Sequence, residues 1–451
     1  MTARQDFHLP RGWTMVRLDE VVQTSSGGTP SSKNTAYYGG DIPWVKIGDL
    51  TDGHVSATEQ TITELGLDCS SAKLLPAGTV LVAMYGSIGK LGILDVPAAT
   101  NQAICAMQPS EVVDRDYLFW FLRANREYLM SLGRGGNQKN IGQGDLKPLL
   151  LPVPPLAEQR RIVAALEHHL TSIADGEARI RAAQDSVHPF RRSVLDEALG
   201  GCVAPRGPGP SKLPELPAGW EWSTVADEGT VQLGRMLNKE RSSGPHMRPY
   251  LRVANVLDNR IDFSDVKEMD FPPAEFERYE LKPGDILLNE GQSPELLGRP
   301  AMYHGEMPGV CFQKTLLRFQ VGARVDGGFA LLVFRYYLYS GRFRRESRIT
   351  TGIGHLTAER FTVMEFPVPP LQEQHRIVRE TAGLLDGADE LQRALEAARR
   401  DAVNLRRSLL HQAFRSGLAT QLDDDEPARE LLDRLPKPSA RKKRRAVLVA
   451  E

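Results

Sequence analysis

A segment of thirteen residues occurs twice in this chain, and the repeat restricts the possible folds more than any other feature. Residues 151–163 are LPVPPLAEQRRIV and residues 366–378 are FPVPPLQEQHRIV, an offset of 215 residues. The segment LPRGW at 9–13 also returns as LPAGW at 216–220. An internal repeat of this kind divides a chain into equivalent halves. Each half therefore contains a globular part, a proline-rich joint and the segment that follows the joint.

The segment after each joint has the periodicity of a long helix. In both copies, apolar residues recur every seven positions with polar residues between them, a spacing typical of helices that pair as a coiled coil. The residues expected to make this pairing are Leu166, Ile173, Ile180, Val187 and Val194 in the first copy and Ile377, Leu384, Leu391, Ala398 and Leu405 in the second, together with Ala388, Leu395, Ala402 and Leu409. Each helix would contain ~40–45 residues and extend about 60–65 Å. Pro189 lies inside the first pattern and predicts a kink.

The globular part of each half has the pattern of a mixed, mainly β domain. The runs at 79–86, 285–291 and 43–50 predict short strands bounded by glycine and proline. Residues 114–132 and 327–347 predict helices between the strands. We therefore expect an α+β fold with two β-rich domains, each followed by a long helix.

These patterns give a predicted domain plan for all 451 residues, a length that suggests about three domains. The plan is a first domain at 1–155, a helix at 156–200, a linker at 201–216, a second domain at 217–370, a second helix at 371–418 and a charged, largely disordered tail at 419–451 that contains one short helix at 427–435. The pair Gly200–Gly201 is expected to end the first helix.

The overall composition indicates a globular protein of the cytoplasm. No apolar run approaches the ~20 residues that cross a bilayer, and the start of the chain lacks the pattern of a signal peptide. The four cysteines lie far apart without a CxxC pair, which favours ordinary thiols in a reducing compartment. The net charge of −1 does not by itself indicate a nucleic-acid-binding protein.

No pattern in the sequence predicts catalysis. The segment GSIGK at 86–90 is followed by Leu91 rather than serine or threonine, so it favours a turn between strands over a phosphate-binding loop. There is no GxSxG elbow, HExxH zinc motif or dinucleotide fingerprint. We expect no catalytic residue, no metal ligand and no cofactor bound by this chain.

An ordered set of segments resembles the specificity subunit of type I restriction–modification systems. The repeated joint PVPPLxEQxRIV and its helices are joined by LPRGWTMVRLDEVV near the start, YYGGDIPWVKIGDL at 37–50, YGSIGKLGIL at 85–94, YLRVANVLDNRIDFSDVKEM at 250–269 and SLLHQAFRSGLAT at 408–420. The resemblance extends from about residue 9 to about residue 420. It rests on the whole ordered set rather than on any one segment.

The resemblance implies a DNA-recognition role without chemistry. Each globular domain would be a target-recognition domain for one half of a bipartite double-stranded DNA target. The two helices would pair antiparallel, with an approximate internal two-fold axis, and would dock two methyltransferase subunits. Restriction and translocase subunits would join that complex, and S-adenosylmethionine, ATP and Mg would bind to those partners. Because the two domains differ in sequence, an asymmetric target is expected.

Polar loops between strands supply the candidate DNA-binding residues, because arginine, lysine, asparagine and glutamine contact base edges and phosphates. The loop at 133–142 is expected to correspond to 349–360, and the loop at 85–90 to 289–293. The candidates are Lys46, Tyr85, Ser87, Lys90, Arg134, Asn137, Gln138, Lys139 and Asn140 in the first half and Arg252, Asn255, Asn289, Gln292, Ser293, Lys314, Arg345, Arg348 and His355 in the second.

A second class of function stays open at this point. A coiled-coil scaffold that holds two β-rich protein-interaction modules would have the same repeat, the same helices and no catalytic motif. The near-neutral net charge favours this scaffold slightly. Specific adenine methylation by the purified complex would distinguish the two functions.

Overall fold

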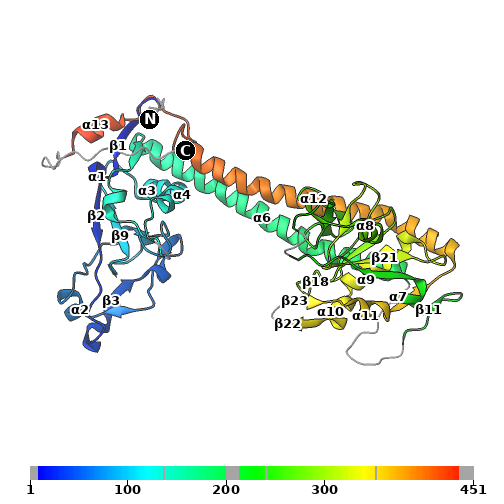
Figure 1. Ribbon diagram of the computed structural model, residues 1–451. Coiled ribbons are helices and arrows are strands. Elements are labelled where there is room, and N and C mark those ends of the chain that lie inside the picture. The colour runs from blue at the N-terminus through cyan, green and yellow to red at the C-terminus, as the bar shows by residue number, and fades with distance from the viewer. Residues whose placement is uncertain (1–8, 136–137, 200–212, 239–241, 351–352, 436–451) are drawn as a thin grey trace. The chain divides into compact units, whose positions relative to one another are not determined.

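The computed structural model describes residues 9–135, 138–199, 213–238, 242–350 and 353–435 (Figure 1). The chain divides into two compact units, of which unit 1 comprises 1–178 and 399–451 and unit 2 comprises 179–398. The expected α+β class is confirmed, because each unit combines several small sheets with helices. No helix in the described ranges is long and apolar enough to cross a membrane.

Unit 1 is built on a five-stranded sheet in the order β2-β9-β6-β7-β4. Its strands are β1 (Thr14–Arg17), β2 (Val22–Ser26), β3 (Tyr38–Val45), β4 (Gly53–Val55), β5 (Thr61–Ile62), β6 (Val80–Ala83), β7 (Leu91–Leu94), β8 (Ala99–Thr100), β9 (Ile104–Pro109) and β10 (Leu150–Val153). Its short helices are α1 (Leu18–Val21), η1 (Thr35–Tyr37), η2 (Ile47–Asp49), α2 (Glu64–Asp68), α3 (Arg115–Ala124), α4 (Arg126–Ser131), α5 (Gln143–Leu146) and α13 (Ala428–Asp433).

Both faces of the central sheet in unit 1 are buried, which explains why β6 is apolar at every position. Val80 and Val82 point into the main core together with Leu118 and Leu122 of α3. Leu81 belongs to a second cluster on the other face. A strand enclosed on both faces requires a continuous apolar run rather than alternation.

Unit 2 repeats this plan with a four-stranded sheet in the order β12-β21-β17-β19. Its strands are β11 (Glu221–Thr224), β12 (Gly229–Leu233), β13 (Met247–Leu251), β14 (Val256–Leu257), β15 (Arg260–Ile261), β16 (Lys267–Asp270), β17 (Ile286–Asn289), β18 (Gly291–Gln292), β19 (Pro300–Met302), β20 (Cys311–Phe312), β21 (Leu316–Val321), β22 (Arg348–Thr350), β23 (Ile353–His355) and β24 (Glu365–Val368). Its short helices are α7 (Val225–Glu228), α8 (Pro273–Tyr279), α9 (Gly327–Tyr339), α10 (Arg342–Glu346) and α11 (Ala358–Thr362).

Two helices of 43 residues each, α6 (Leu156–Ala198) and α12 (Leu371–Ala413), contribute to both units. In unit 1 the start of α6 packs against the end of α12, with Leu166 and Ala413 in the same core (Figure 1). In unit 2 the end of α6 packs against the start of α12, with Leu195 and Ile377 in the same core. This reversed order of contacts is antiparallel pairing. Helix α6 also continues past Pro189.

The predicted pairing residues of α12 are partly wrong. Leu384, Leu391 and Leu405 are 53%, 48% and 56% exposed, whereas Leu385 is buried in the core of unit 2. A seven-residue spacing identifies residues that lie in line along a helix. It does not show which of these lines of residues packs against the partner helix. The buried face of α12 includes the small residues Thr381 and Ala388, so its pattern is weaker than that of the exposed leucines.

The other predicted pairing residues face inward to different degrees. Leu166, Val187 and Val194 are buried. Ile173, Ile180 and Leu395 are half-buried. Leu409 is half-buried and packs against the core of unit 1. The named residues of α6 are thus all buried or half-buried, as are Leu395 and Leu409 of α12.

A buried glutamine explains the repeated joint in unit 1. Gln159, the glutamine of the EQ pair, is fully buried beside the first turn of α6. Its Nε2 donates to the carbonyl oxygens of Val112 and Pro154, both at 2.9 Å. Its Oε1 accepts from the backbone N–H of Asp114, the N-cap of α3, at 2.7 Å. One side chain thus connects α6, the proline joint and the start of α3.

The same connection recurs in unit 2 at the equivalent residue. Gln374 is fully buried, and its Nε2 donates to the carbonyl oxygens of Arg324 at 2.9 Å and Pro369 at 2.8 Å. Its Oε1 accepts from the backbone N–H of Asp326, the N-cap of α9, at 2.8 Å. The repeated glutamine therefore makes the same three hydrogen bonds in both units.

Unit 2 also contains a buried ionic network. Arg335 of α9 is 2% exposed and lies 3.3 Å from Asp258 and 3.0 Å from Asp389 of α12. Arg191 of α6 reaches the same two carboxylates, at 3.4 Å and 2.6 Å. Burial opposes the charge of Arg335, but Asp258, Tyr339 and Asp389 outweigh it and hold the pKa of Arg335 above its usual value. A network of this kind favours one register of α6 against α12.

The tail is more ordered than expected up to residue 435. Helix α13 forms within the predicted 427–435, and Ala428 is buried in the core of unit 1. The backbone N–H of Ala428 donates to the carbonyl oxygen of Gly12 at 3.0 Å, and Arg161 pairs with Asp425. The apolar residues of α13 complete this core. The high charge of the tail, which suggested disorder, therefore did not indicate that α13 packs against unit 1. Residues 436–451 lie outside the described ranges.

The glutamine connection makes a stability prediction with a matched control. Gln374→Ala should lower the free energy of unfolding of unit 2 by about 2–4 kcal/mol, because it leaves buried backbone groups without partners. Gln372→Ala, at an exposed glutamine two residues away, should change it by less than about 0.5 kcal/mol. Denaturant unfolding of both variants measures the difference. Equal stability of the two variants would contradict a structural role for Gln374.

Candidate nucleic-acid interface

The ends of several strands in unit 1 meet at one edge of its central sheet. Strands β2 and β6 end at this edge, and β9 and β7 begin there, because these neighbours are antiparallel. The segments that follow or precede them are 27–29, 84–90 and 101–103. We call these segments, together with 134–140, the first loop edge. Of this last segment, residues 136–137 lie outside the described ranges.

A close backbone approach shapes one end of the first loop edge. A methyl group on Gly27 would lie 2.0 Å from the carbonyl oxygen of Thr100, so only glycine fits there. The chain then presents Thr29, which is exposed and donates its hydroxyl to the side-chain oxygen of Gln102. Gln102 is exposed as well. These two residues were not among the sequence candidates, although the GGT segment at 27–29, which follows β2, was a usable signal.

The two loops that the sequence singled out in unit 1 meet in the structure. Tyr85 and Asn140 form an antiparallel bridge, and Asn140 also bridges to Arg134. Tyr85 is 44% exposed, and Ser87, Gln138, Lys139 and Asn140 are exposed. Candidate Asn137 lies outside the described residues. The first loop edge therefore presents amides, one aromatic ring and one lysine on neighbouring segments.

Unit 2 has a corresponding edge. Strands β12 and β17 end there, and β21 and β19 begin there. We call the segments 234–235, 289–293, 313–315 and 348–355, of which 351–352 are not described, the second loop edge. Its two candidate loops also pair, because β18 and β22 flank β23 in a three-stranded sheet.

The second loop edge combines cationic side chains with a carboxylate, that of Glu290. Lys314 is exposed, and its backbone N–H donates to the carbonyl oxygen of Arg235 at 2.8 Å. Arg235, which the sequence candidates missed, is paired with Glu275 at 2.7 Å. His355 lies 3.5 Å from Glu290, and its side chain is 44% exposed. Gln292 and Ser293 are half-buried at the same edge.

Several cationic candidates already have partners in the described structure. Lys46 pairs with Glu59 at 2.9 Å, Lys90 donates to the carbonyl oxygen of Ile47 at 3.3 Å, and Arg134 pairs with Asp145 at 3.1 Å. In unit 2, Arg252 pairs with Asp265, and Arg345 donates to the carbonyl oxygen of Ser340 at 3.1 Å. Arg348 begins β22. The exposed pairs are weak enough to exchange for a phosphate.

Two candidate asparagines hold the fold instead. Asn255 is 2% exposed, and its Nδ2 donates to the carbonyl oxygens of Asp262 at 2.9 Å and Asp265 at 3.1 Å. Asn289 is fully buried at the end of β17. Because asparagine is polar, both positions were expected in exposed loops. A buried asparagine amide can instead form hydrogen bonds with backbone groups at a tight turn. The Nδ2 of Asn289 also donates to a backbone group, the carbonyl oxygen of Val256 at 3.4 Å.

The turn at 86–90 is confirmed as a connection between strands, since it joins β6 to β7 with Gly86 and Gly89 at φ of 64° and 77°.

Within the described ranges, no group of three histidine, cysteine or acidic side chains is placed to hold a metal ion.

Two units with polar loop edges, sharing a pair of long helices, define a modular recognition protein. A family profile for the type I restriction modification DNA specificity domain matches residues 10–182 and again 217–397. The chain belongs to this family, the non-catalytic DNA-recognition subunits of type I restriction–modification systems. Members of the family recognise DNA targets and assemble with methyltransferase and restriction subunits.

Individual relatives extend over nearly the whole chain. The StySPI specificity subunit of Salmonella potsdam is 26% identical over 436 residues, covering 93% of this chain and 92% of the relative. The EcoKI specificity subunit of Escherichia coli K12 is 24% identical over 454 residues, with the same two coverages. A crystal structure of the HsdS subunit from Thermoanaerobacter tengcongensis has a TM-score of 0.53 at 20% identity, covering 92% of this chain and all of that one.

Stability measurements can distinguish a buried asparagine that supports the fold from an exposed one at a loop edge. Asn255→Ala should lower the free energy of unfolding of unit 2 by about 2 kcal/mol, because three backbone groups lose their hydrogen bonds to this buried side chain. Asn140→Ala, at an exposed side chain of the first loop edge, should change stability by less than about 0.5 kcal/mol. Thermal unfolding followed by circular dichroism measures both. A stable Asn255 variant would return that residue to the DNA-binding candidates.

Proposed function

We propose that each loop edge contacts one half of a bipartite double-stranded DNA target. The main support is that, in both units, loops distant in sequence come together at the same edge of the central sheet. Backbone amides, hydroxyls and cations there would hold phosphates, and the exposed amides and lysines would contact base edges. The first unit would follow the predicted domain 1–155 and the second the domain 217–370, with 156–200 and 371–418 as the helices between and after them.

The target is asymmetric in this proposal because the two loop edges differ in chemistry. The first edge exposes the amides of Gln102, Gln138 and Asn140 beside Lys139, which we assign to a phosphate, and amides pair best with adenine. The second edge exposes Lys314, and lysine pairs best with guanine. One half of the target should therefore depend on an A·T pair and the other on a G·C pair.

The chain would supply recognition to a larger complex. We propose that α6 and α12 dock two methyltransferase subunits, and that restriction and translocase subunits join that complex. S-adenosylmethionine, ATP and Mg would bind to those partners, and the assembly would work in the cytoplasm, where it meets DNA.

Substitutions in one unit should affect one half of the target. Gln102→Ala should relax discrimination by about 1–3 kcal/mol at a position in one half, and Lys314→Ala should do so only in the other half. The measurement is adenine methylation of a random-sequence library by each purified complex, mapped by sequencing. Lys282→Ala is the control, because Lys282 lies beyond the opposite end of β17.

Two results would count against this proposal. If both variants relaxed the same half, the two edges would not act on separate half-sites. If the unmodified complex methylated no defined sequence, the DNA-recognition role would itself be lost.

Phosphate contact makes a separate prediction. Lys139→Ala should weaken binding of all sequences alike and reduce the slope of log affinity against log salt by about one. Filter binding or fluorescence anisotropy of the complex at several salt concentrations measures the slope, with Lys282→Ala again as the control. An unchanged slope would remove Lys139 from the interface.

A further inference from the structure

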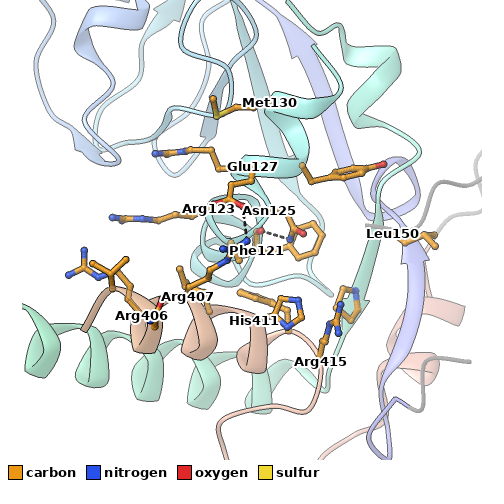
Figure 2. Close-up of a pocket in the computed structure, with 18 of the residues that line it drawn as sticks. Phe121, Arg123, Asn125, Glu127, Met130, Leu150, Arg406, Arg407, His411 and Arg415 are labelled. Atoms are coloured by element: carbon orange, nitrogen blue, oxygen red, sulfur yellow. Dashed lines mark hydrogen bonds and ion pairs between the residues drawn. The ribbon is translucent and has the colours of Figure 1, made fainter. Parts of the chain in front are cut away.

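Unit 1 contains a pocket of about 480 Å³ between the short helices α3 and α4 and the last turns of α12. Figure 2 shows Arg406, Arg407 and His411 rising from α12 toward Phe121 and Glu127 on the other side. The volume is within the range of ligand pockets and accommodates one or two large side chains.

The floor of this pocket is apolar. Phe414 and Phe121 are 7% and 2% exposed and meet edge to face, with ring centroids 5.7 Å apart. At the rim, however, Val403 is 58% exposed and Met130 is 51% exposed. Exposed apolar groups beside an apolar floor indicate a surface that another apolar group can cover.

The walls of the pocket carry a surplus of positive charge. Its lining includes the five arginines Arg123, Arg126, Arg406, Arg407 and Arg415, and one carboxylate, that of Glu127. Arg126 is paired with Asp52, and Arg406 with Glu177 at 3.1 Å. Burial, together with the charges of Arg415 and Arg407, lowers the pKa of His411.

The pocket already binds a carboxylate of its own chain. Glu127 lies 3.0 Å from Arg407, and the two side chains are 79% and 76% exposed. An ion pair this exposed contributes little to stability, so an incoming carboxylate can replace Glu127. Arginine is well suited to that exchange, because its guanidinium group binds carboxylates through two parallel hydrogen bonds.

The apolar floor distinguishes a protein ligand from DNA. A DNA backbone would satisfy the arginines but has no apolar group to fill the space above Phe121 and Phe414.

The pocket wall also touches the first loop edge, because Arg126 donates to the carbonyl oxygen of Gly89 at 2.8 Å. An occupant would thus lie close to the recognised DNA, where a methyltransferase must act.

We propose that this pocket docks a segment of the methyltransferase subunit in which an apolar side chain is flanked by carboxylates. The apolar side chain covers Phe121, Phe414 and Val403, and the carboxylates pair with Arg407 and its neighbours. This assignment rests on the proposed function, because it requires the methyltransferase subunit to be a partner.

The affinity of the purified chain for the purified methyltransferase subunit tests the pocket. The double variant Val403→Asp/Arg407→Glu should bind the methyltransferase at least about tenfold more weakly, while its thermal unfolding stays unchanged because both side chains are exposed. Glu127→Gln removes the internal competitor and should tighten binding. The control is Arg399→Glu, an exposed arginine of α12 outside the pocket lining.

A photo-crosslinking residue at Val403 then identifies the occupant within the complex of chain, methyltransferase and DNA. A crosslink to a methyltransferase peptide with an apolar residue beside aspartate or glutamate supports the proposal. A crosslink to DNA, or to a peptide without carboxylates, overturns it. If the unmodified chain binds the methyltransferase but the double variant binds equally well, only the pocket is refuted. If the unmodified chain does not bind the methyltransferase, the proposed function fails as well.

Discussion

The buried glutamine at each joint is the interaction on which the arrangement of both units depends. Gln159 and Gln374 each connect the first turn of a long helix to the proline joint before it and to the N-cap of the helix over the central sheet. The prolines restrict the chain before the helix to extended conformations. The glutamine then fixes the direction in which the helix leaves. Sheet, short helix and long helix are thereby held in one geometry in both halves, although the rest of their sequences has diverged.

With that geometry fixed, strand order decides which loops meet. In both units the antiparallel neighbours of the central sheet bring the end of one strand beside the beginning of the next, so that three segments share one edge. A fourth segment joins them through its own backbone pairing. The units keep this topology but differ in what the edge exposes, three amides beside Lys139 in unit 1 and Lys314 in unit 2. In the proposed function, a shared frame with different edge residues would allow each unit to recognise different bases without changing its fold.

The sequence was sufficient for features encoded by local pattern. The repeat predicted two halves, the seven-residue spacing predicted both long helices, and the glycines predicted the turn at 86–90. It was insufficient where burial decides the role of a residue. Leu384 and Leu385 are neighbours of identical type, yet one is exposed and the other buried, because only the partner helix selects the inward column.

The same distinction between local pattern and burial applies to the residues of the candidate interface. The loops were selected because they are polar and follow strands, and the repeat indicated which loop of one half corresponds to which loop of the other. That the two loops within each unit pair with each other could not be predicted from the sequence. The burial of Asn255 could not be predicted, because an amide that satisfies backbone carbonyls looks identical in sequence to one that faces solvent. Thr29 and Gln102 were missed because they come together only through the antiparallel contact of β2 and β9.

The way the chain is divided between the units has a consequence for biosynthesis. Unit 2 is one continuous stretch, 179–398, whereas unit 1 needs both its N-terminal part and the residues after 398. Phe414 and Ala428 are part of the core that surrounds Tyr117. During translation, unit 2 can therefore complete its core before unit 1, although unit 1 begins first. The first unit must wait, with an exposed apolar surface, until Phe414 and Ala428 have been synthesised.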